Sequence, residues 1–177
     1  MSQSSSMITL GGGCFWCLDA VFREVSGITN CVSGYAGGPS RNPTYEQICT
    51  GNSGHAEVVQ LHFDPSQISL QKVLSIFFTI HDPSTLNRQG NDIGTQYRSV
   101  IFCTDSQQRQ QVETFIQEYQ ANQHQHAPIV TEVLESVTFW PAEDYHQDYF
   151  RKNPGQGYCQ FVVAPKIKKY RQLAGSL

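Results

Sequence analysis

The sequence predicts an α+β fold, a ferredoxin-like βαββαβ two-layer sandwich in which helices pack on an antiparallel or mixed sheet. Segments with alternating apolar residues and segments with helical apolar spacing follow one another in the order β-α-β-β-α-β, with a further α-β pair after them. The 177 residues are 39% hydrophobic and 11% aromatic, which is enough for one sizeable core. No repeat, low-complexity tract or linker divides the chain, so residues 1–177 are expected to form a single domain.

The expected elements of the first half are a strand at 7–10, a helix at 14–25, a strand at 28–35, a Gly/Pro-rich loop at 36–45, a strand at 55–64 and a helix at 69–81. Those of the second half are a loop at 82–96, a strand at 97–103, a helix at 106–120, a strand at 129–136 and a short added helix at 142–153. Residues 1–6 are expected to be flexible, and 160–177 to form an irregular tail.

Charge and hydropathy exclude several classes of protein. Twelve basic and 15 acidic residues give a net charge of -3, which provides no strong attraction to nucleic acid or to an anionic membrane. The N-terminal "MSQSSSMITL" lacks the pattern of a signal peptide, and the apolar stretch "VLSIFFTI" is too short to span a bilayer. A cytoplasmic protein that binds neither membranes nor nucleic acid is therefore expected.

Six cysteines in a chain without an export signal favour redox catalysis, metal binding or burial over a disulfide scaffold. Cys14 and Cys17 form a CxxC motif, but neither a second CxxC nor a suitably spaced histidine pair follows to complete four ligands. No metal site is predicted.

The stretch "LGGGCFWCLDAVF" predicts a tight turn that leads from a strand into a helix at Cys14. A thiol at the start of a helix meets free backbone N–H groups and the positive end of the helix dipole, so the thiolate of Cys14 should be favoured. Together with Cys17 it could form a dithiol redox pair. The large rings of Phe15 and Trp16 between the two cysteines suit a hydrophobic ligand wall better than a surface that exchanges disulfides with proteins.

Three further side chains are candidates. Glu57 shares strand parity with apolar neighbours, so it is either a buried carboxyl that burial keeps protonated or a strand-edge residue that turns to solvent. Tyr45 and Tyr97 lie at loop ends, where active-site groups gather, although their surroundings in the sequence alone favour simple packing.

Five segments together resemble the A-type peptide methionine sulfoxide reductases over about residues 8–159: "GGGCFWCLDAVF", "GYAGG", "NPTYEQICTGNSGHAEVVQLHFDP", "HDPSTLNRQGNDIGTQYRSVIF" and "PAEDYHQDYFRKNPGQGYC". By this resemblance Cys14 attacks the sulfoxide sulfur, and a protonated Glu57 hydrogen-bonds the sulfoxide oxygen. The matching tyrosines Tyr45 and Tyr97 share that role, and Asp92 belongs to the surrounding network. Phe15 and Trp16 form the wall that receives the S-methyl group.

The resemblance implies an enzyme that reduces methionine S-sulfoxide, both in oxidised proteins and as the free amino acid, and leaves a sulfenic acid on Cys14. A second thiol then forms a disulfide, and an external dithiol such as thioredoxin restores both cysteines, with no metal or organic cofactor. Cys159 in "KNPGQGYC" matches the recycling cysteine, while Cys17 stays open as an alternative. We expect the protein to act as a monomer.

Two other functions compete with this interpretation. A dithiol–disulfide oxidoreductase would use Cys14 and Cys17 and would not need Cys159. A non-catalytic module would hold oxidised methionine in its aromatic pocket, and its binding would survive the loss of the Cys14 thiol.

Overall fold

The computed structural model describes residues 5–123, 127–135 and 137–175. The expected flexibility of residues 1–4 lies outside the described part of the chain, whereas residue 6 already opens the first strand. The strands are β1 (Ser6–Gly11), β2 (Ile28–Ala36), β3 (Ala56–Phe63), β4 (Arg88–Gln89), β5 (Asp92–Ile93), β6 (Val100–Cys103), β7 (Glu132–Glu135) and β8 (Trp140–Pro141). The helices are α1 (Phe15–Phe22), α2 (Tyr45–Cys49), α3 (Leu70–Ile80), α4 (Ser106–Asn122), α5 (Tyr149–Lys152) and α6 (Ala164–Gly175). Two 3-10 turns (η1, Thr95–Tyr97; η2, Asp144–His146) and a π-helical turn (η3, Cys159–Val163) complete the order.

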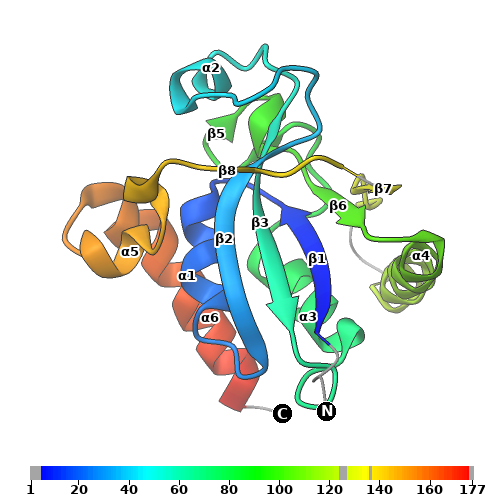
Figure 1. Ribbon diagram of the computed structural model, residues 1–177. Coiled ribbons are helices and arrows are strands. Elements are labelled where there is room, and N and C mark those ends of the chain that lie inside the picture. Colours follow the sequence, from blue (N-terminus) through cyan, green and yellow to red (C-terminus); the bar gives the residue numbers. More distant parts are fainter. Residues whose placement is uncertain (1–4, 124–126, 136, 176–177) are drawn as a thin grey trace.

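A six-stranded sheet with the order β7-β6-β1-β3-β2-β8 forms the centre of the molecule (Figure 1). The neighbours among β6, β1, β3 and β2 are antiparallel, and only β7 joins its neighbour β6 in parallel. Helices α1, α3 and α6 cover one face of the sheet, and α4 lies at the side of β6 and β7 (Figure 1). The predicted α+β class is confirmed, with the five predicted strands near their expected positions and the two-residue β8 added at the edge of the sheet.

Alternation along β3 places its side chains on two separate cores. Val59, Leu61 and Phe63 join the large core beneath the helices, whereas Ala56 and Val58 join a small cluster on the opposite face. Val137 and Phe139, in the segment that crosses the sheet towards β8, cover that small cluster.

The expected irregular tail at 160–177 is wrong for the described residues, because the chain is helical there up to Gly175. Val163 and Ile167 are buried and Tyr170 packs against the same core, a spacing of four and three residues that places them on one helix face. This face packs on α1 and α3. Pro165 has no N–H to donate, so one backbone hydrogen bond of the helix is missing. The π-helical turn just before it accommodates this gap.

The expected single helix at 142–153 is also divided in the structure. It consists of the short turn η2 and the one-turn helix α5, separated by Asp148 in the left-handed conformation with φ of 55°. In addition, α2 begins at the end of the expected loop, where Thr44 and Gln47 form a reciprocal capping box. No helix among the described residues is long and apolar enough to cross a membrane.

Replacing Ile167 with alanine tests whether the tail helix contributes to the core. Ile167 is 3% exposed, so Ile167→Ala should lower the free energy of unfolding by about 2–5 kcal/mol. Lys168→Ala, on the exposed face of the same helix, is the matched control and should change it by less than about 0.5 kcal/mol. Urea unfolding followed by circular dichroism makes the measurement, and equal effects of the two substitutions would contradict the packing of α6.

Candidate active site

Cys14 lies at the end of the sheet where β1 ends and α1 begins (Figure 1). It is the N-cap residue of α1 and follows a turn of three glycines. The backbone conformation and the close contacts of this turn require glycine. Gly13 has φ of +84°, a left-handed conformation, and its N–H donates to the Tyr97 carbonyl at 3.1 Å. A Cβ at Gly12 would lie 2.8 Å from the His81 ring. The three glycines therefore bring the backbone close enough to its neighbours to place the thiol at the helix start.

The Glu57 side chain is buried beside Cys14 and does not turn to solvent. Its residue is 1% exposed and lies on the β3 face that carries Val59 and Leu61. One carboxyl oxygen accepts a hydrogen bond from the backbone N–H of Phe15 at 3.1 Å, and the Cys14 thiol also hydrogen-bonds the carboxyl group. Of the two alternatives for Glu57, the structure supports the buried acid.

Burial decides the protonation of both groups. It raises the pKa of Glu57 to about 8, and the charge of Asp92 acts in the same direction against the hydrogen bond from Phe15. Burial also raises the pKa of Cys14 well above that of a free thiol, and the nearby Glu57 and Cys17 raise it further. At neutral pH this site therefore holds a protonated carboxyl beside a protonated thiol.

The expected thiolate at Cys14 is thus not favoured in the ligand-free site. The backbone N–H of Trp16 lowers the pKa of Cys14, as a helix start should, although the Cys14 side chain makes no capping hydrogen bond. Desolvation outweighs this effect because Cys14 is only 8% exposed and a carboxyl group lies next to it.

Both candidate tyrosines lie around the same two groups. Tyr45 is the first residue of α2, and Tyr97 ends η1. Burial raises the pKa of each phenol, and the Glu57 charge is the next cause for both. They are therefore neutral hydroxyl groups beside Glu57 and Cys14, as the resemblance implied.

Tyr158 is a member of the site that the sequence analysis missed. Its hydroxyl donates to Asp92 and lies within hydrogen-bonding reach of the sulfurs of both Cys14 and Cys17. Burial raises the pKa of this phenol, and the two thiols raise it further, so it is neutral. The only signal in the sequence was its position immediately before Cys159.

Trp16 has a fixed orientation. Its indole N–H donates to Nδ1 of His146 at 3.0 Å, and its ring stacks on Tyr149 with centroids 3.7 Å apart and planes 3° apart. Phe15 is 0% exposed and packs against the rings of Tyr35 and His146. Of the two predicted wall residues, Trp16 therefore presents accessible surface, while Phe15 supports the site from inside.

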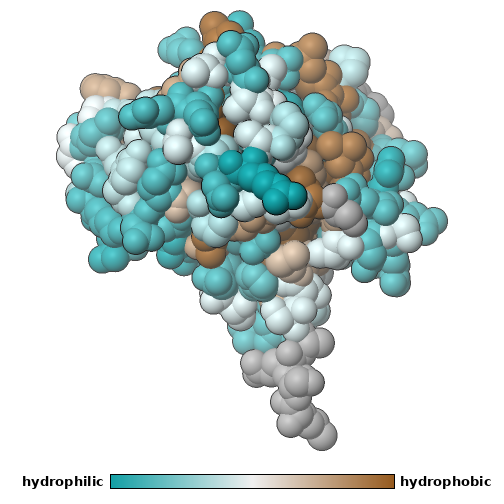
Figure 2. All heavy atoms as spheres, turned by 45° about the horizontal axis from the view of Figure 1, so that its top comes forward, coloured by the Kyte–Doolittle hydropathy of each residue, from teal (hydrophilic) through white to brown (hydrophobic). Residues whose placement is uncertain are grey.

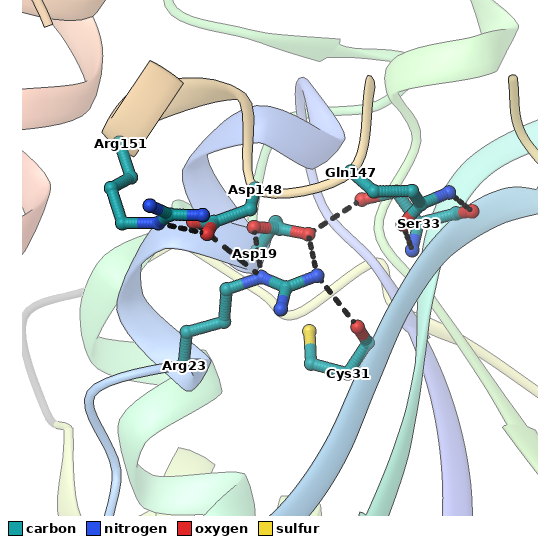
Figure 3. Close-up of polar contacts among 7 residues, drawn as sticks. All are labelled: Asp19, Arg23, Cys31, Ser33, Gln147, Asp148 and Arg151. Carbon is teal, nitrogen blue, oxygen red and sulfur yellow. Dashed lines mark hydrogen bonds and ion pairs between the residues drawn. The ribbon is translucent and has the colours of Figure 1, made fainter. Parts of the chain in front are cut away.

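A polar network around the buried Asp19 attaches the segment with His146 and Tyr149, the two partners of the Trp16 ring, to the rest of the fold (Figure 3). Asp19 of α1 is 1% exposed and accepts two hydrogen bonds from Arg23, at 2.7 and 3.2 Å, and one from the Ser33 hydroxyl at 3.1 Å. The Gln147 side chain pairs with the backbone N–H and carbonyl of Ser33, both at 2.9 Å. Asp148 lies 3.8 Å from Arg23 and also binds Arg151.

A second attachment runs through Glu143. It accepts hydrogen bonds from the Tyr35 hydroxyl at 3.0 Å and from the backbone N–H of Tyr45 at 3.1 Å. One carboxylate thus fixes both the start of α2, which carries a candidate tyrosine, and the segment that leads to His146. Nothing in the sequence pattern alone distinguished Glu143 from an ordinary surface acid.

Cys159 begins η3 and is 0% exposed, with its N–H donating to the Gln156 side chain at 3.0 Å. Burial is the sole cause that raises the pKa of its thiol. All six cysteines are free in this structure. Among the described residues, no group of three or more His, Cys, Asp or Glu side chains is arranged to hold a metal ion.

A groove of about 980 Å³ adjoins the site, and Asp92, Tyr158 and Lys166 line its near side. Figure 2 looks onto this end of the molecule, where apolar side chains gather in patches among hydrophilic ones. Ile93 and Phe161 are 70% and 81% exposed. Asp92 and Tyr158 connect this groove to the site, whereas Cys14 and Glu57 are not among its lining residues.

Comparisons with known proteins agree with this geometry. The family model described as "Peptide methionine sulfoxide reductase" matches residues 6–176. A peptide methionine sulfoxide reductase MsrA from Polynucleobacter asymbioticus is 52% identical over 169 residues, covering 96% of this chain and 89% of its own. The structure of methionine sulfoxide reductase A of Corynebacterium diphtheriae has a TM-score of 0.83 at 35% identity, over 90% of this chain and 80% of that chain.

A further solved structure is that of Mxr1 from Saccharomyces cerevisiae in complex with Trx2, with a TM-score of 0.58 at 26% identity, over 84% of this chain and 89% of that chain. The family model spans nearly the whole chain, and the bacterial relative shares more than half of its residues. The chain therefore belongs to the peptide methionine sulfoxide reductase family of enzymes.

Proposed function

We propose that this enzyme reduces methionine S-sulfoxide to methionine, in oxidised proteins and as the free amino acid, with Cys14 as the nucleophile and Glu57 as the acid. One observation carries the proposal: the Cys14 thiol and a carboxyl group with a pKa of about 8 are buried together and hydrogen-bonded. A sulfoxide needs both groups at once, because its sulfur becomes electrophilic when its oxygen receives a proton.

The reaction uses the two protons of the resting site, one on the Glu57 carboxyl and one on the Cys14 thiol. Glu57 donates its proton to the sulfoxide oxygen, and the Cys14 thiol proton returns to the same carboxyl, to which it is already hydrogen-bonded. The Cys14 sulfur is oxidised by two electrons and takes the oxygen as a sulfenic acid, while the substrate sulfur is reduced and leaves as methionine. Tyr45 and Tyr97 are assigned to donate hydrogen bonds to the oxygen, and their raised pKa values support a role as neutral hydroxyl groups.

The Trp16 ring is the surface we assign to the substrate S-methyl group. Its hydrogen bond to His146 and its stacking on Tyr149 hold it in one orientation, with Phe15 packed behind. A sulfoxide sulfur carries three different substituents and a lone pair, so a fixed thiol, acid and methyl wall accept one epimer. This arrangement supports specificity for a single epimer, which the family resemblance assigns as S.

Recycling is assigned to Cys159 and an external thioredoxin-type dithiol, without a metal or organic cofactor. The oxygen of the Cys14 sulfenic acid leaves as water on the way to a Cys14–Cys159 disulfide, and thioredoxin then reduces that disulfide. A Cβ at either Gly155 or Gly157 would meet nothing within 4 Å, so the segment before Cys159 is free of close packing that would resist its movement. The complex of Mxr1 with Trx2 supports the choice of reductant.

Two finer assignments accompany this function. The enzyme is proposed to act as a monomer. The order β6-β1-β3-β2, with α1 and α3 as the crossover helices, supports a ferredoxin-like classification of the central unit.

The first prediction concerns the nucleophile and the epimer. With dithiothreitol, the wild-type enzyme should release methionine continuously from the S-sulfoxide; without a reductant, release should stop once the thiols are oxidised. Cys14→Ser should abolish release because a hydroxyl group cannot accept the oxygen in this way. Chromatographic assay of methionine from each resolved epimer makes the measurement.

The matched control for that experiment is Cys103→Ser, which removes a thiol that is 2% exposed on β6, outside the site. It should release methionine as the wild-type enzyme does. Release from the R epimer, or by Cys14→Ser, would contradict the proposal.

The second prediction concerns pH. Glu57 acts in its protonated form, and this form is lost as the pH rises through about 8, so kcat/KM should be level below that value and fall above it. Glu57→Gln keeps a hydrogen-bond donor but cannot transfer a proton, and should lower kcat/KM by about 10²- to 10⁴-fold. The pH profile of Glu57→Gln should also lose the alkaline fall near pH 8. If the wild-type enzyme and Glu57→Gln both show that fall, the titration belongs to another group.

A further inference from the structure

Cys17, rather than Cys159, is the thiol that lies next to Cys14 in the reduced enzyme. It is the third residue of α1, and its backbone N–H donates to the Cys14 carbonyl at 3.1 Å. Residues three apart on a helix are neighbours with Cβ atoms about 5–6 Å apart, so a disulfide between these two would draw the Cβ atoms together to about 3.5–4.5 Å. Cys17 is 0% exposed and Cys14 8% exposed, so both thiols are buried away from bulk water.

Two interactions connect the thiols of Cys14 and Cys17. The Tyr158 hydroxyl is within hydrogen-bonding reach of both sulfurs. Cys17 is also among the causes that raise the pKa of Cys14, whereas burial is the sole cause for Cys159. Cys159 is therefore electrostatically separate from the nucleophile.

Lys166 gives Cys17 an environment that Cys14 lacks. Burial raises the pKa of Cys17 and the Asp92 charge acts in the same direction, whereas the Lys166 ammonium and the Tyr158 hydroxyl lower it. Nζ of Lys166 reaches the glycine turn, since a Cβ at Gly13 would lie 3.8 Å from it. Among the ion pairs of the described residues, none involves Lys166, so its charge is not neutralised there by a carboxylate.

We propose that Cys17 is the first resolving thiol of the enzyme: its sulfur attacks the sulfur of the Cys14 sulfenic acid and forms a Cys14–Cys17 disulfide. This inference rests on the proposed function, which supplies the sulfenic acid. The new S–S bond replaces the S–O bond of Cys14, the hydroxide leaves with the Cys17 proton as water, and no further oxidant is needed. Lys166 is a positioning residue that favours the Cys17 thiolate.

This step joins two residues of one helical turn, whereas direct attack by Cys159 would bring in a thiol from a separate element, η3. Cys159 is 0% exposed within η3, and Gln156 holds its backbone N–H. Once the Cys14–Cys17 disulfide exists, Cys159 can attack the Cys14 sulfur, which gives the Cys14–Cys159 disulfide and returns Cys17 to the thiol. The sulfenic acid is thus removed before the slower movement of the tail, which limits its further oxidation.

The test uses Cys159→Ser, in which Cys17 is intact and the tail thiol is absent. The variant is mixed with one equivalent of methionine S-sulfoxide without a reductant, trapped with dimedone and iodoacetamide after methionine release, and digested with trypsin. Residues 1–23 form one tryptic peptide that contains both Cys14 and Cys17. We expect this peptide to lack two hydrogens and to carry no alkyl group, and a dimedone adduct on Cys14 with an alkylated Cys17 would overturn the inference.

Kinetics of sulfenic acid loss provide a second measurement in the full-length enzyme. Cys17→Ser should slow the loss of dimedone reactivity by about tenfold or more, since a neighbouring thiol gains a large effective concentration. Cys31→Ser removes another buried thiol on β2 and should leave this rate unchanged. Equal rates in the two variants would contradict the role of Cys17.

Lys166→Met should move the pH profile of disulfide formation to higher pH, whereas Lys169→Met, a matched change on the same helix, should not. An unshifted profile would remove Lys166 from the proposal. If the wild-type enzyme releases no methionine, the proposed function itself fails. If methionine is released but Cys17 stays a free thiol in Cys159→Ser, only the present inference fails.

Discussion

The exclusion of water from the Glu57 carboxyl is the physical condition on which the rest of the site depends. The carboxyl lies on the core face of β3, and burial there raises its pKa to about 8. The same exclusion keeps the Cys14 thiol protonated. An ionised pair at this depth would be two like charges in a medium of low dielectric constant, which is costly. The site therefore rests in a neutral form and separates charge when a polar sulfoxide arrives.

The C-terminal part of the chain maintains this exclusion. The segment from Glu143 to Tyr158 supplies the partners of Trp16, the hydroxyl beside both thiols and the carboxylate that fixes the start of α2. It is attached far from the thiol, through the pairing of Gln147 with Ser33 and through the charges around Asp19 (Figure 3). This attachment orients the catalytic side chains through helices and strands.

The sequence was informative where one local rule controls the outcome. Strand parity placed Glu57 on the face of its apolar neighbours but left burial and solvent exposure as alternatives, and the glycines before Cys14 predicted the turn, because both depend on neighbouring residues alone. The protonation of Cys14 was predicted with the wrong sign, since the helix start is visible in the sequence but the desolvation by distant segments is not. Tyr158 was missed for the same reason. The helix α6 was missed because its apolar residues form a buried face only when they pack on α1 and α3.

Three thiols in one small region need different environments if each is to act at its own time. A nucleophile that meets a sulfoxide beside an acid can remain protonated, because the acid returns its proton during the reaction. A resolving thiol has no such partner and attacks as the thiolate, so it benefits from a fixed cation. The Lys166 charge lowers the pKa of the Cys17 thiol, whereas burial alone acts on the pKa of the Cys159 thiol. The charges around the three sulfurs thus favour the order Cys14, Cys17, Cys159, and the tail helix that supplies Lys166 takes part in the redox chemistry as well as in the core.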